Sequence, residues 1–98
     1  MEYSFAAPVW VWSGTPAWHF ASVPEDIADD IEARTRGTAR GFGSVRVEAS
    51  SQRVTWRTSL FPDSKSGTYL LPVKKQVRQQ LGCEEGSLID LTLRLIEE

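Results

Sequence analysis

Short stretches of the chain alternate apolar and polar residues, which is the pattern of half-buried β-strands. The clearest runs from Ser87 to Ile96, where every second residue from Ile89 to Leu95 is apolar and the residues between are polar or charged. Similar stretches predict strands over residues 5–12, 17–23, 44–50, 53–60 and 68–71. Pro8 lacks the backbone donor that a central strand needs, so we expect an edge position or a bulge there.

Two helices are predicted between these strands, each beginning at a proline. Pro24 suits a first helical turn, and the apolar stripe that follows it fades near Arg34. Pro72 is expected to begin the second helix, in which Val73, Val77 and Leu81 form the buried side. Gly82 is expected to cap the end of this second helix in a left-handed conformation.

The order of elements repeats once along the chain. A strand, a proline, a helix and a further strand occupy residues 18–49, and the same order recurs over residues 68–95. This repeat indicates a duplicated unit. We therefore predict a mainly β protein with two short helices, built as a closed double-split β-barrel capped by the helices. Closure also removes the exposed sheet edges that such a chain would otherwise present.

Length and composition bound the remaining possibilities. The 98 residues predict a single barrel domain over residues 1–98, with four tryptophans to fill its core. A single cysteine excludes an internal disulfide and gives no support to an oxidising compartment. Residues 3–24 carry no charged side chain except His19, but turn-forming residues at 13–16 argue against a membrane span. We expect a cytoplasmic protein without membrane contact.

The net charge of −2 conceals a strong segregation along the chain. Residues 1–35 sum to −5, residues 36–81 to +7, and residues 82–98 to −4. Such asymmetry bears on binding partners rather than on the fold.

Several segments, taken in order, resemble a known bacterial family. They are Trp18-His19-Phe20 with Val23-Pro24, Gly41 to Val47, Thr55 to Pro62, Gly67 to Arg78, and the closing Leu81-Gly82 and Glu85-Gly86. Together they are similar to the family catalogued as domain of unknown function 1905. The resemblance implies a double-split β-barrel related in shape to AbrB-like transcription factors. It implies no catalytic residues, and the spacing between Pro72 and Val77 departs from the AbrB-like unit by about two residues.

The basic middle of the chain contains the candidate site. Lys74 and Lys75 are expected in the first turn of the second helix, where free amides and the helix dipole favour an anion. If hydroxyl groups point toward that turn, one anionic ligand could be bound by a set drawn from the basic segment: Arg40, Trp56, Ser59, Tyr69, Lys74, Lys75 and Arg78. The alternative is that Trp56 belongs to the core and the lysines simply face solvent.

Other chemistries have little support in the sequence. His19 is the only histidine, so a nucleophile–base pair would have to use it. No cluster has metal-ligand spacing, and Gly37, Gly41 and Gly43 match no phosphate or dinucleotide motif, so no metal or cofactor is predicted. We expect a binding module for an anionic small molecule or a protein rather than an enzyme. A nucleic-acid-binding regulatory protein is the alternative, although the flanks of the chain are acidic.

Overall fold

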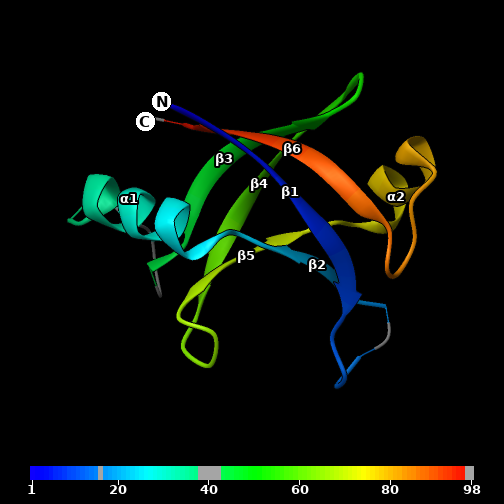
Figure 1. Ribbon diagram of the computed structural model, residues 1–98, viewed down its shortest axis with the longest axis horizontal. Helices are drawn as coiled ribbons and strands as arrows, with labels where there is room; N and C mark the ends of the chain where they lie inside the picture. Colours follow the sequence, from blue (N-terminus) through cyan, green and yellow to red (C-terminus); the bar gives the residue numbers. More distant parts are fainter. Residues whose placement is uncertain (16, 38–42, 97–98) are drawn as a thin grey trace.

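The computed structural model describes residues 1–15, 17–37 and 43–96. It is a mainly β structure with two helices, as predicted, and Figure 1 shows the strands wrapping around one centre. The elements in chain order are β1 (Glu2–Val11), β2 (His19–Ser22), α1 (Glu25–Thr35), β3 (Val45–Ser51), β4 (Val54–Asp63), β5 (Thr68–Pro72), α2 (Lys75–Leu81) and β6 (Leu88–Leu95). The strands close into a barrel in the order β1-β2-β5-β4-β3-β6, with every pair antiparallel.

The core fills the inside of this barrel with alternate residues of each strand. In β6, Ile89, Leu91 and Leu93 are buried, and in β3 the buried apolar residues are Val45, Val47 and Ala49. The predicted alternation is therefore confirmed for both strands. Ala28 and Ile31 of α1 and Val77 and Leu81 of α2 pack against the same core. The helices lie at opposite ends of the barrel (Figure 1).

Pro8 lies where β1 changes its partner. Residues 2–8 pair with β6, and residues 9–11 pair with β2. Because Pro8 is the last residue of the first ladder, its missing donor costs little there. The expected edge does not exist, because the barrel is closed; the proline lies at the boundary between two ladders instead.

β1 begins at Glu2 and β2 at His19, not at residues 5 and 17, and two larger errors involve β5. Pro72 does not begin a helix: it is the last residue of β5, and α2 begins at Lys75 after the cap residue Lys74. Phe61 to Asp63 were expected in a loop, but they extend β4 by pairing with residues 68–70 of β5. By contrast, α1 follows Pro24 directly, and Gly82 caps α2 with a left-handed φ of 66°, both as predicted.

The predicted internal repeat is present and includes one more strand than expected. The unit β1-β2-α1-β3 is matched by β4-β5-α2-β6. The second strands of the two units, β2 and β5, pair with each other. Two equivalent hydrogen bonds fix the alignment: Val23 N donates to Tyr69 O, and Val73 N donates to His19 O. Val23 therefore corresponds to Val73 and His19 to Tyr69. Pro24 corresponds to Lys74 and not, as the sequence suggested, to Pro72.

Candidate ligand-binding hollow

An open hollow of about 570 Å³ lies beside the start of α2, where β2, β5 and the end of β4 meet. Its walls are almost wholly apolar and consist mainly of Trp18, Phe20, Phe61, Leu70, Pro72 and Val73. Ala17, His19, Lys74 and Lys75 complete the lining. This volume is in the range of small-molecule sites, which are typically apolar with a few polar groups. We call it the β2–β5 hollow.

Two of the seven predicted site residues, Lys74 and Lys75, line this hollow. Both lysines are exposed, and neither forms an ion pair within the described part of the chain. Their positive charge therefore stands beside the apolar walls without a neighbouring carboxylate. Since α2 has only seven residues, these side chains and not the helix end are the charged feature of the site.

The other predicted site residues have different contacts. Trp56 is a core residue, 7% exposed, as the alternative interpretation held. Ser59 accepts a hydrogen bond from Arg46, at 3.3 Å. Arg78 donates to the backbone oxygen of Val73, at 2.7 Å. None of these three lines the hollow.

Tyr69 and Arg40 complete the predicted set. Tyr69 is buried at the α1 end, where burial raises the pKa of its hydroxyl and a hydrogen bond with Thr35 opposes that rise. The structure thus does not join Tyr69 with the lysines in the hollow. Arg40 lies outside the described residues.

Comparison of the two halves of the barrel explains why this hollow is open. In the first half, Trp10 donates its indole N–H to Ser22, at 2.9 Å, across the outer surface. By the alignment of the repeat, Phe61 and Pro72 occupy the equivalent positions in the second half, and neither can form such a bond. The sequence has thus replaced a hydrogen-bonded pair with two apolar side chains that leave a depression.

At a second pair of equivalent positions, a hydrogen-bonding residue in one half again corresponds to an apolar residue at the hollow. Thr68 donates its hydroxyl to the backbone oxygen of Val23, and its counterpart in the other half is Trp18. Trp18 forms no such bond and is 54% exposed at the hollow. The charges differ as well, because Pro24 and Glu25 at the start of α1 correspond to Lys74 and Lys75 at the start of α2. The hollow at the start of α2 therefore combines apolar walls from both halves with two cations that the start of α1 does not have.

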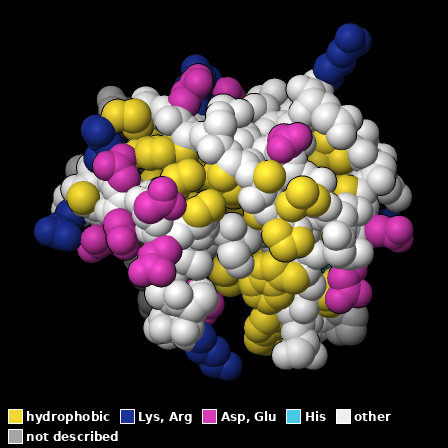
Figure 2. All heavy atoms as spheres, in the orientation of Figure 1, with side chains coloured by type: hydrophobic (Ala, Val, Ile, Leu, Met, Phe, Trp, Pro, Cys, Tyr) yellow, Lys and Arg dark blue, Asp and Glu magenta, His cyan; other side chains and the backbone are white. Residues whose placement is uncertain are grey.

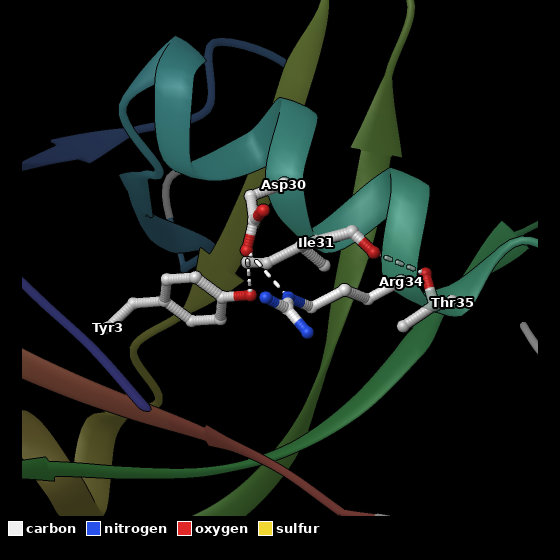
Figure 3. A network of polar contacts seen from close by, with 5 residues as sticks. All are labelled: Tyr3, Asp30, Ile31, Arg34 and Thr35. Atoms are coloured by element: carbon white, nitrogen blue, oxygen red, sulfur yellow. Dashed lines mark hydrogen bonds and ion pairs between the residues drawn. The ribbon is translucent and has the colours of Figure 1, made fainter. Parts of the chain in front are cut away.

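The first half is also held by a polar network at α1, shown in Figure 3. Tyr3 of β1 donates to Asp30 at 2.5 Å, and Arg34 donates to the same carboxylate oxygen at 2.8 Å. These hydrogen bonds lower the pKa of Asp30, while burial and the bond to Asp30 raise the pKa of Tyr3. The network fastens α1 to β1; it lies apart from the β2–β5 hollow, whose lining includes none of its members.

Another depression, of about 420 Å³, lies on β1, β3 and β6 and is lined largely by hydroxyl-bearing and polar residues. Ser4 and Thr92 hydrogen-bond to each other in it, at 3.1 Å. Phe5 is the single aromatic residue in its lining, which contains no lysine. Elsewhere in the described residues, no group of three or more His, Cys, Asp or Glu side chains could hold a metal ion. Nor is any helix among them long and apolar enough to span a membrane.

Sequence reasoning found the lysines but missed the aromatic walls. Trp18 and Phe20 stand two residues apart in the strand predicted over residues 17–23, which puts them on one face, but Phe61 was expected in a loop and Pro72 in a helix. Only the pairing of β4 with β5 brings Phe61 beside Leu70, and only the pairing of β2 with β5 brings Phe20 beside Pro72.

These features define a small closed β-barrel with a two-fold internal repeat and an open apolar hollow beside α2. The chain belongs to the family described as domain of unknown function DUF1905, whose model matches residues 5–93 and so covers nearly all of the chain. No curated protein matches the chain significantly.

Proposed function

We propose that the protein is a binding module whose ligand is an organic anion with an apolar body, held in the β2–β5 hollow. The observation that carries the proposal is the placement of Lys74 and Lys75 at a depression whose remaining walls are apolar. Apolar contact supplies affinity roughly in proportion to buried area, and a cation beside it selects a negatively charged group. A cytoplasmic location, consistent with the single cysteine, is part of the proposal.

The protein gives no comparable support to a catalytic role at this site. His19 lines the hollow, and one of its ring nitrogens lies 3.3 Å from the backbone oxygen of Ala17. No serine, cysteine, threonine or carboxylate side chain is among the lining residues, so no hydroxyl, thiol or carboxylate nucleophile stands beside His19 there. The geometry favours binding without chemistry.

The proposal is tested by isothermal titration calorimetry with two acids, nonanoate and 2-naphthoate, and with their neutral amides. We expect the acids to bind more tightly than the amides. In the double variant Lys74→Glu/Lys75→Glu, acid binding should weaken by about tenfold or more, with little change for the amides. Lys65→Glu is the matched control, because this exposed lysine lies in the β4–β5 loop and outside the hollow lining.

A second variant tests whether the hollow itself is the site. Phe61→Trp/Pro72→Ser reproduces the hydrogen-bonded pair that Trp10 and Ser22 form in the other half. We expect it to fill the depression and to abolish binding of both acids while the barrel remains folded. Unchanged affinity in both double variants, or no heat with either acid on the wild type, would overturn the proposal.

A further inference from the structure

Trp18 is held at the hollow by another tryptophan. The rings of Trp12 and Trp18 are stacked, with centroids 5.3 Å apart and an angle of 27° between their planes. Two backbone hydrogen bonds fix the turn that carries them: Trp12 N donates to Trp18 O, and Trp18 N donates to Thr15 O, each at 2.9 Å. The indole at the hollow is therefore positioned before any ligand arrives.

Gly14 also lies against the ring of Trp12. A Cβ atom added to Gly14 would lie 2.2 Å from a ring carbon of Trp12, so this glycine leaves space that the ring fills. Trp12 thus contacts both Gly14 and Trp18, and it is not itself part of the hollow lining. A glycine at this position permits the stack.

Aromatic side chains dominate the hollow near Trp18. Phe20 and Phe61 line it as well, and Phe61 is 47% exposed. Half-exposed rings of this kind are costly to leave in water and gain from a ligand that covers them. Aromatic pairs are worth roughly 0.5–1.5 kcal/mol beyond their buried area, which corresponds to about two- to tenfold in affinity.

We propose that the ligand of the β2–β5 hollow is a planar aromatic acid, whose ring system packs against the Trp18 indole and whose acid group faces Lys74 and Lys75. This inference rests on the proposed function and specifies the ligand class. The stack of Trp12 on Trp18 holds one wall in place, so little side-chain entropy is lost when a ligand binds. A saturated acid of the same size gains the same burial and the same charge contact but not the ring contact.

The test compares 2-naphthoate with its saturated analogue, decahydro-2-naphthoate, by calorimetry on the full chain. We expect the aromatic acid to bind about two- to tenfold more tightly. In Trp18→Leu, which keeps an apolar side chain but removes the ring, the two affinities should approach each other, chiefly because 2-naphthoate weakens. Trp12→Phe keeps a ring behind Trp18 and should retain most of the preference.

Gly14→Ala provides a variant outside the hollow. The added methyl group must displace Trp12, so we expect the exciton signal of the tryptophan pair in circular dichroism to fall and the preference for 2-naphthoate to shrink. Ser13→Ala, in the same turn, is its control.

The outcomes separate the two proposals. If neither acid binds, the proposed function fails. If both acids bind the wild type equally, or Trp18→Leu keeps the full preference, the hollow is an anion site without aromatic selectivity and this inference is overturned.

Discussion

At the scale of single residues, Trp56 shows how a side chain can fill the core and still leave a polar group without a hydrogen bond. It lies in the barrel core, and its indole N–H is buried with no hydrogen-bond partner in the part of the chain described. A buried donor without a partner costs part of the stability that the ring contributes. The protein keeps the ring because its volume fills the core between the strands.

We therefore expect Trp56→Phe to cost less than about 2 kcal/mol, because the smaller ring fills most of the space and carries no unpaired donor. Trp56→Ala should cost about 3–5 kcal/mol through the cavity it leaves. Urea unfolding followed by circular dichroism measures both. Affinity for 2-naphthoate should not change in Trp56→Phe, since Trp56 does not line the hollow. A cost of Trp56→Phe well above about 2 kcal/mol would contradict the assignment of an unpaired N–H.

The residues that sequence reasoning assigned correctly are those whose role depends on local pattern. The alternation of β6 and the cap at Gly82 were both readable from their neighbours in the chain. Trp56 was assigned to a site because it stands among basic residues, but burial depends on which face of β4 points inward. Phe61 was missed for a related reason: only its partner Leu70, distant in sequence, makes it part of a wall.

At the scale of elements, the two helices differ although their positions are equivalent. α1 has eleven residues and is tied to β1 by Tyr3 and Asp30, whereas α2 has seven residues and is held through the backbone of Val73 by Arg78. The proline at residue 72 could not reveal this difference, because a proline suits both the last residue of a strand and the first turn of a helix. The strand pairing decided between them.

The attachment of α1 should make stability depend on pH. The hydrogen bonds from Tyr3 and Arg34 lower the pKa of Asp30 in the folded protein, so the ionised carboxylate stabilises the fold above its ordinary pKa. That contribution is lost as the pH falls through the lowered value. The difference in unfolding free energy between wild type and Asp30→Asn should thus be largest near neutral pH and shrink on acidification.

The measurement is urea unfolding of both proteins between neutral and strongly acidic pH. Asp29→Asn is the control, because Asp29 is an exposed neighbour on the same helix with no hydrogen bond or ion pair among the described contacts. A difference for Asp30→Asn that stays constant over this range would contradict the assignment. At alkaline pH the raised pKa of Tyr3 predicts a further loss in the wild type once its hydroxyl ionises.

At the scale of the whole molecule, the outer surface of the barrel has two distinct parts. Across β1, β6, β3 and β4, one row of paired residues alternates in charge: Glu2, Arg94, Glu48 and Arg57. Across β1, β2 and β5, the corresponding row is apolar: Trp10, Phe20 and Pro72. In Figure 2, hydrophobic side chains gather over the β1 and β2 side of the visible face. The apolar row and the β2–β5 hollow thus lie on the same side of the barrel, since Phe20 and Pro72 belong to both.

The charged row also bears on the alternative of nucleic-acid binding, because two arginines of the basic middle segment, Arg36 and Arg57, form ion pairs with carboxylates. Glu48 contacts both Arg57 and Arg94, and Arg36 pairs with Glu32. Nucleic-acid binding requires cations that are free to replace counterions along a phosphate backbone. We therefore expect no retardation of a short DNA duplex or single strand in gels at low salt.

The variant Glu48→Gln provides a stricter test of this expectation. It removes the carboxylate that pairs with Arg57 and Arg94 but keeps the shape of the side chain. If the wild type is held back from binding only by this carboxylate, the variant should retard DNA in a salt-dependent way. We expect at most weak retardation, since Arg57 and Arg94 alone supply few phosphate contacts. Strong, salt-dependent binding by the wild type would instead mean that the basic segment acts as one surface, and the hollow would lose its place as the functional site.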